Sequence, residues 1–173
     1  EAKKFIGDEP FMFYLSDMDV ITALKDAAKR NVEVSVILDP NKDAFGRQKN
    51  GIPNRQVASE LNAVGIPIRW CDTRGEQCHS KMLFKYNAQQ AEIILGSANL
   101  TARNLKNYNL ETDMRVLGSV QAPVFKDAGQ YFDAAWTNAH GRQITVDYAK
   151  YADESKVKYW LYRFMEWSGL STF

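Results

Sequence analysis

The sequence contains little of what marks a specialised class of protein. Among its 173 residues only two are histidine, two are cysteine and five are proline. No apolar run approaches the roughly 20 residues that a membrane-spanning helix needs, and no signal peptide is visible. The net charge is only +1, so no strong overall field attracts nucleic acid or an anionic membrane. With 45% hydrophobic and 25% charged residues, the chain has the balance of a soluble globular domain with a substantial core.

The scarce cysteines, Cys71 and Cys78, bracket a short polar loop. Three interpretations stay open: free thiols, a disulfide formed in an oxidising compartment, and a metal site. Zinc is disfavoured, because His79 is the only nearby third ligand and nothing completes the set. The chain begins with Glu1 rather than methionine, which favours a fragment or a processed product and leaves the compartment open.

Strand and helix signals alternate along the first part of the chain. Strands are predicted at 11–15, 32–38 and 66–70, separated by helices that start at Ser16-Asp17 and at Asn54. This β-α-β-α-β order predicts a parallel start to the sheet, with helices packed against it. Later strands, at 79–84, 91–95 and 112–117, follow short connections and can run in mixed directions. We therefore predict an α/β/α sandwich: a mixed, largely parallel β-sheet flanked by helices.

The first candidate site residues lie in the segment His79-Ser80-Lys81. In an extended strand, side chains two residues apart point to the same face. His79 and Lys81 should therefore project together while Ser80 faces away. A neutral imidazole can attack phosphorus, and a nearby ammonium can bind the phosphate oxygens, so this pairing favours phosphoryl chemistry.

A second group of polar residues follows the apolar strand 91–95. Gly96 ends that strand in a turn, and Ser97 and Asn99 then offer a hydroxyl and a carboxamide before a short helical turn at 100–105. Both types are also common turn residues. Glu111, which precedes the next strand, is a candidate to accept the imidazole N–H and fix its tautomer, unless it is a simple strand-edge carboxylate.

Together these motifs resemble the signature of the phospholipase D superfamily, His-x-Lys followed by Gly-Ser-x-Asn. The similarity of organisation covers about residues 11–138, and the matching residues are His79, Lys81, Gly96, Ser97 and Asn99. Glu111 looks like the family's supporting carboxylate. One position departs from the pattern, because Tyr86 stands where the family motif ends in aspartate.

The resemblance implies a covalent mechanism that needs no metal or other cofactor. One histidine attacks phosphorus to give a phosphohistidine, and a second protonates the leaving oxygen. Because this chain has a single His-x-Lys motif, the second would come from another copy in a homodimer or from a separate half of a longer protein. We favour the C-terminal half of a bacterial two-motif, cardiolipin synthase-like member, in the cytoplasm or at the membrane. A non-catalytic half-domain that binds phosphate and completes a partner half's active site is the competing interpretation.

The substrate is predicted less directly than the chemistry. A near-neutral charge and an aromatic C-terminal region favour a phospholipid, with phosphodiester hydrolysis or phosphatidyl transfer as the reaction; an endonuclease is the alternative. The long loop 41–53 carries Lys42, Arg47 and Lys49, and loops after strand ends border the binding crevice of open α/β sheets. These three residues are therefore candidate substrate-binding cations, or else charges on a solvated surface loop.

The chain is predicted to have two parts, a catalytic half-domain over 1–140 and a helical extension over 141–173 packed on it. Helical spacing recurs over 122–138 and again from Lys156 to Trp167. The second helix is crowded with aromatic residues. It is either a helix packed on its own domain, an interface helix or a lipid-contacting surface that would allow peripheral membrane contact.

Overall fold

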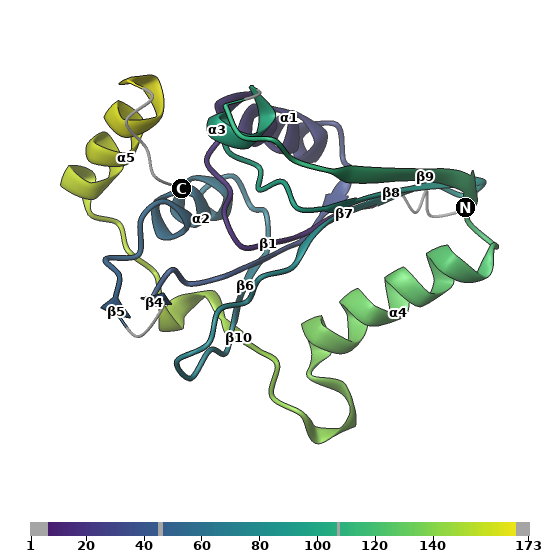
Figure 1. Ribbon diagram of the computed structural model, residues 1–173. Helices are drawn as coiled ribbons and strands as arrows, with labels where there is room; N and C mark the ends of the chain where they lie inside the picture. The colour runs from purple at the N-terminus through teal and green to yellow at the C-terminus, as the bar shows by residue number, and fades with distance from the viewer. Residues whose placement is uncertain (1–6, 45–46, 107, 169–173) are drawn as a thin grey trace.

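The computed structural model describes residues 7–44, 47–106 and 108–168. Its main element is an eight-stranded sheet, most of whose strands are labelled in Figure 1. The strand order is β10-β6-β3-β1-β7-β8-β9, with β2 paired to β1 beside β3. The strands are β1 (Gly7–Met12), β2 (Glu33–Val34), β3 (Val36–Leu38), β6 (Ile68–Cys71), β7 (Lys81–Tyr86), β8 (Gln90–Gly96), β9 (Asp113–Ser119) and β10 (Thr145–Asp147). The α/β class predicted from the sequence is confirmed.

The predicted parallel start is present. Strand β1 pairs in parallel with β2 and β3, and β3 pairs in parallel with β6. Helices α1 (Met18–Lys29) and α2 (Asn54–Asn62) connect these strands. Asp17 caps α1 by accepting the backbone N–H groups of Asp19 and Val20, as the sequence indicated.

The prediction of a largely parallel sheet is wrong for the remaining strands. Strands β7, β8 and β9 form an antiparallel meander, β7 pairs antiparallel with β1, and β10 pairs antiparallel with β6. The physical reason is the length of the connections. Only three residues separate β7 from β8, enough for a hairpin but not for the crossover that a parallel pair requires.

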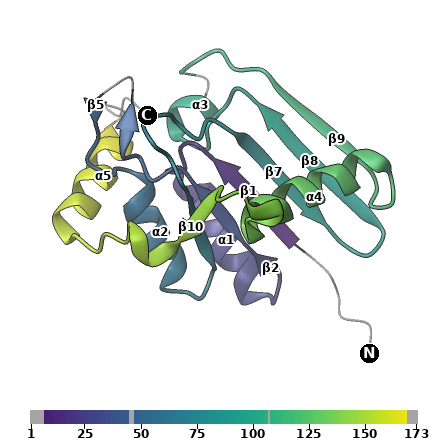
Figure 2. The same cartoon turned by 90° about the horizontal axis from the view of Figure 1, so that it is seen from below.

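Helices cover both faces of the sheet, which gives three layers. On one face, α1 and α2 pack on Val36, Leu38 and Trp70. On the other, α4 (Pro123–Thr137) places Phe132 against Phe11 and Ile37 and Phe125 against Phe84 and Ile93. Figure 2, seen from below, shows α4 in front of the strands. Strand β3 contributes to both layers because successive side chains of a strand point to opposite faces.

Two local expectations differ from the structure. The loop over 41–53 contains a small hairpin, β4 (Asp43–Ala44) and β5 (Arg47–Gln48). Asn54 does not cap α2 with its side chain; it is fully buried and binds the backbone N–H of Leu15 and the carbonyls of Phe13 and Asp39. A buried carboxamide satisfied by three backbone groups ties the loop to the end of β1.

The segment expected to be a helical extension begins with a strand. After the 3-10 turn η1 (Ala139–Gly141), β10 joins the edge of the main sheet, and a second turn, η2 (Tyr148–Lys150), leads to α5 (Lys156–Ser168). Tyr162 of α5 is fully buried among the side chains of α1, α2 and the sheet. The C-terminal residues therefore share the core of the preceding part of the chain.

Candidate active site

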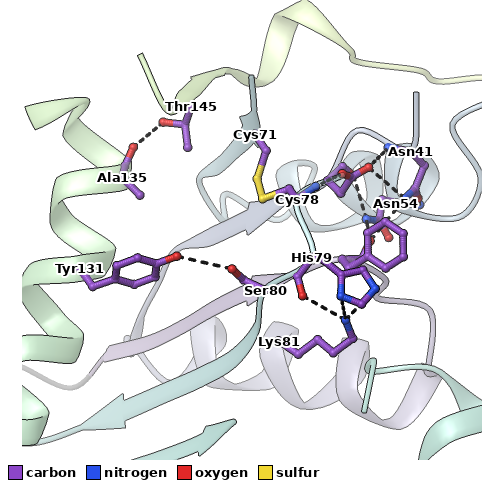
Figure 3. The surroundings of a disulfide bond; sticks show 12 residues. Asn41, Asn54, Cys71, Cys78, His79, Ser80, Lys81, Tyr131, Ala135 and Thr145 are labelled. Carbon is purple, nitrogen blue, oxygen red and sulfur yellow. Dashed lines mark hydrogen bonds between the residues drawn. A yellow bond between two sulfur atoms is a disulfide. The ribbon is translucent and has the colours of Figure 1, made fainter. Parts of the chain in front are cut away.

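The His79-Lys81 pair lies where the chain enters β7. Strand β7 begins at Lys81, and His79 and Ser80 precede it. The ammonium of Lys81 lies 3.0 Å from His79 Nδ1 and 3.3 Å from Nε2, and it donates to the His79 carbonyl at 3.1 Å. Figure 3 shows both side chains on one side of the strand and Ser80 on the other, where its hydroxyl lies 3.5 Å from that of Tyr131. The predicted orientation of all three side chains is confirmed.

The environment of this pair favours an uncharged imidazole. Partial burial of the ring and, to a smaller extent, the positive charge of Lys81 hold the pKa of His79 below its ordinary value of 6.5. Burial also lowers the pKa of Lys81, while the negative charge of Glu111 opposes that shift. His79 remains exposed and Lys81 is almost fully buried. The nucleophile candidate is therefore accessible, and the cation beside it is held in place.

The segment from Gly96 to Asn99 is shaped by a close approach of two strands. A Cβ atom at Gly96 would collide with the backbone of Thr112 and with Asp113, so only glycine fits there. Ser97 then donates its N–H to the Thr112 carbonyl at 3.1 Å and accepts the N–H of Thr112 on its hydroxyl at 2.9 Å. These bonds fix the Ser97 hydroxyl at the end of β8.

Glu111 binds residues other than the one predicted. One carboxylate oxygen accepts the Ser97 hydroxyl at 2.6 Å, and the other accepts the side-chain N–H of Asn104. Among the described hydrogen bonds none joins Glu111 to His79, so the expectation that it fixes the imidazole tautomer is wrong within this chain. Its link to the pair is electrostatic, through Lys81.

Asn99 is held through both its side chain and its backbone N–H. Its side-chain oxygen accepts the N–H of Tyr14 at 3.2 Å, and its own N–H donates to Asn104 Oδ1 at 3.1 Å. Asn104 lies in the short helix α3 (Ala102–Leu105), which Thr101 caps. The sequence interpretation missed Asn104, although the Thr-x-x-Asn spacing resembles an N-terminal capping pattern and could have drawn attention to it.

Two aromatic residues after β1, Phe13 and Tyr14, lie between the His79-Lys81 pair and the loop over 41–53, called the basic loop below. The centroid of the Phe13 ring lies 4.7 Å from the centroid of the His79 ring. The same Phe13 centroid lies 5.3 Å from the Lys81 ammonium. Lys49 binds the Tyr14 hydroxyl and lies 6.0 Å from the Phe13 centroid. The Phe13 ring therefore lies close both to a lysine of the loop and to the His-x-Lys pair.

The three predicted substrate-binding cations have different placements. Lys49 is brought to the site, as described above. Lys42 directs its ammonium to the Thr73 carbonyl at 3.4 Å. Arg47 lies in β5, and its side chain is outside the described residues, as is that of His140 in η1.

A disulfide bond holds the loop that carries His79. Of the alternatives that the sequence left open, the structure has the Cys71–Cys78 bridge between β6 and the residue before His79 (Figure 3). The N–H of Cys78 also donates to the carboxylate of Asp39 at 2.8 Å, and Asp39 accepts the N–H of Asn41 at 2.7 Å. Asp39 was not predicted, because only the folded chain brings the end of β3 to this loop.

The comparison with family models agrees with this geometry. The model described as the PLD-like domain of cardiolipin synthase matches residues 9–136, most of the chain. No curated protein matches the chain.

Similar folds occur among solved structures. Nuc from Salmonella typhimurium, described as a phospholipase D family member, is 17% identical, with a TM-score of 0.61 over 83% of this chain and 82% of that one. NucT from Helicobacter pylori is 16% identical, with a TM-score of 0.53 over 76% and 79%. Phosphatidylserine synthase from Haemophilus influenzae is 12% identical, with a TM-score of 0.60 over 95% of this chain but 40% of that one. These likenesses show the fold, and with the family model they show that the chain belongs to the phospholipase D superfamily.

Proposed function

We propose that this chain is a phosphodiester hydrolase or phosphatidyltransferase domain that acts through a phosphohistidine formed on His79, with a phospholipid as the preferred substrate. The observation that carries the proposal is the contact between an exposed imidazole of lowered pKa and the buried ammonium of Lys81. This pair supplies a neutral nucleophile and a fixed cation for a phosphate oxygen.

The proposed reaction has two displacements at phosphorus. In the first, a ring nitrogen of His79 forms a bond to phosphorus while the bond from phosphorus to the leaving oxygen breaks, and that oxygen takes a proton from an acid. In the second, the oxygen of water or of an acceptor alcohol attacks phosphorus, the nitrogen–phosphorus bond breaks, and the acid recovers a proton from the attacking group. The charge on the phosphoryl oxygens is stabilised by the Lys81 ammonium and the side-chain N–H groups of Asn99. Ser97 donates its one hydroxyl proton to Glu111 and would have to turn away from Glu111 to donate to a phosphoryl oxygen.

The proposed reaction also needs a general acid that protonates the leaving oxygen. His79 cannot carry out nucleophilic attack and protonate the leaving oxygen in the same step. We propose that a second His-x-Lys motif comes from another copy of the chain or from a separate half of the protein. This chain covers 82% of Nuc, which supports a site built from two copies. It covers only 40% of the longer phosphatidylserine synthase, which supports a separate half of the protein as the source of the second motif.

The Tyr86 substitution does not favour the non-catalytic alternative. Tyr86 ends β7, five residues beyond Lys81, which corresponds to about 17 Å along an extended strand. Its ring stacks on Phe84, with centroids 5.0 Å apart. The residue that departs from the family pattern therefore lies far from His79, and the groups proposed to react are all present.

The experiment that tests the proposal is hydrolysis of bis(p-nitrophenyl) phosphate over a range of chain concentrations. His79→Ala should abolish the activity, and His140→Ala, which changes the other histidine, should retain it. A specific rate that rises with concentration would support assembly from two copies. Full activity in His79→Ala would overturn the proposal.

The substrate class is tested separately. If a phospholipid is the substrate, a phosphatidylglycerol micelle should be cleaved with a higher kcat/KM than a single-stranded oligonucleotide. A preference for the oligonucleotide whose affinity falls steeply with salt would favour the endonuclease alternative.

A further inference from the structure

The C-terminal helix α5 carries more apolar surface than its packing on the domain uses. Its inner face is fixed by Tyr162, whose buried hydroxyl donates to Glu60. The same face carries Glu166, whose carboxylate accepts the Ser16 hydroxyl at 2.6 Å and the Ala102 N–H at 3.4 Å. These contacts hold the helix on the domain without any residue of its outer face.

The outer face of α5 is an exposed apolar stripe. Its members recur at intervals of three and four residues, which places them on one side of a helix. They are Val157, Trp160, Leu161, Phe164 and Trp167, with exposed fractions of 79%, 70%, 45%, 54% and 82%. Large aromatic side chains exposed together mark an interaction surface rather than a packing requirement.

The stripe extends between the two segments that border the candidate active site. At one end of α5, the Lys158 ammonium donates to the carbonyl of Asn50 in the basic loop at 3.1 Å. At the other end, Trp167 lines a cleft of about 220 Å³ between α5 and α3. The cleft is also lined by Arg103, Lys106 and Tyr108, so cations lie beside the aromatic end of the stripe. Its one acidic residue, Glu166, has its carboxylate oxygens engaged as described above.

We infer that the outer face of α5 docks on an anionic phospholipid bilayer, with the cleft between α3 and α5 receiving a headgroup phosphate. Tryptophan and phenylalanine partition to the boundary between headgroups and acyl chains, and nearby cations complement the charge of the lipid phosphates. No helix in the described ranges is long and apolar enough to cross a membrane. The inference deepens the proposed function by placing the lipid surface next to the site.

Co-sedimentation with sucrose-loaded vesicles tests this surface. The chain should bind vesicles of equal parts phosphatidylcholine and phosphatidylglycerol, and Trp160→Ser/Trp167→Ser should bind them at least about tenfold more weakly. The matched control, Leu117→Ser/Val124→Ser, changes two exposed apolar residues on β9 and α4 and should bind like the parent. Lys106→Gln should weaken binding to the mixed vesicles but not to phosphatidylcholine alone.

Two results would overturn the docking surface. One is a parent chain that does not bind the mixed vesicles at low salt. The other is unchanged vesicle binding by the double tryptophan variant, and a simultaneous loss of dimer would then assign the face to a second copy. A shift of the parent's tryptophan emission to shorter wavelength on adding vesicles provides a readout that needs no variant. Vesicle binding without hydrolysis of bis(p-nitrophenyl) phosphate would overturn the proposed catalysis and leave the docking surface supported. Hydrolysis without vesicle binding would overturn the docking surface and leave the proposed catalysis supported.

Discussion

Partial burial and a contact with one neighbouring side chain together lower the pKa of the proposed nucleophile, His79. Because burial and the Lys81 charge both disfavour the imidazolium, the pKa of His79 lies below 6.5 and its ring is neutral at pH 7. Activity that depends on the neutral ring should be constant near neutral pH. It should fall as the pH decreases through the lowered pKa, because the ring then gains a proton and loses its nucleophilic lone pair.

This view predicts the effect of removing the cation. In Lys81→Met the charge that opposes protonation is gone, so the pKa of His79 should rise. The measurement is an NMR titration of the imidazole carbon-bound proton, with His140→Gln used to assign the two histidine signals. An unchanged or lower pKa in Lys81→Met would contradict the role given to this lysine.

Residues close in sequence were predicted well, and residues brought together by the fold were not. The orientation of His79, Ser80 and Lys81 follows from strand geometry alone. The partners of Glu111 and Asp39 depend on which strands become neighbours, which no local pattern specifies. The family resemblance identified Glu111 as important but not what it binds.

At the scale of elements, the loop before β7 is held at three points. The disulfide joins it to β6, the Asp39 carboxylate accepts its Cys78 N–H, and the Ser80 carbonyl accepts the N–H of Phe13 at 3.0 Å. Burial raises the pKa of Asp39, and its hydrogen bonds with Cys78 and Asn41 oppose that rise. A loop fixed in this way loses little freedom when His79 reacts.

Replacing Asp39 tests whether this residue positions the loop that carries His79 or only stabilises the folded chain. Asp39→Ala leaves the N–H groups of Cys78 and Asn41 without acceptors, which should cost about 1–3 kcal/mol and lower kcat by about tenfold or more, with a smaller change in KM. The control is Ile21→Val, in the buried face of α1, which should cost about 0.5–1.5 kcal/mol and leave kcat unchanged. Equal losses of kcat in both variants would show that Asp39 acts only through stability.

Breaking the disulfide should have a related but larger effect on stability. The bridge closes a loop with a sequence separation of seven, so Cys71→Ser/Cys78→Ser should lose about 2–3 kcal/mol of unfolding free energy in the loop-entropy account. The measurement is chemical denaturation together with kcat, compared with the parent in the presence and absence of dithiothreitol. A variant as stable and active as the oxidised parent would contradict the structural role of the bridge.

Element types were predicted more reliably than strand directions. The helices α1 and α4 and the strand β8 follow from hydrophobic spacing and end signals within the segment itself. Strand direction depends on the length of each connection and on which edge of the sheet is free. The pairing of β10 with β6 joins residues more than seventy positions apart, and a three-residue strand carries too weak a pattern to reveal it.

For the whole molecule, the decisive property is whether one chain contains a complete site. The chain has a single His-x-Lys motif, and the proposed mechanism requires both a nucleophile and an acid. If two copies join about a two-fold axis, one His79 can take each role at a shared centre. A mixed dimer that contains only one His79 would then be inactive.

Mixing the parent chain with His79→Ala provides the test. If two copies share one site and exchange freely, an equal mixture should retain about a quarter of the activity of the same total amount of parent, because only parent–parent pairs are complete. Independent chains would retain about half, since activity would follow the amount of parent alone. The same mixture with His140→Ala in place of His79→Ala controls for losses caused by mixing and should keep full activity. If the two chains are unfolded and refolded together so that the subunits mix, a value of one half at concentrations where the chain is dimeric would exclude a site shared by two copies. The acid would then have to come from this chain itself or from a separate half of the protein.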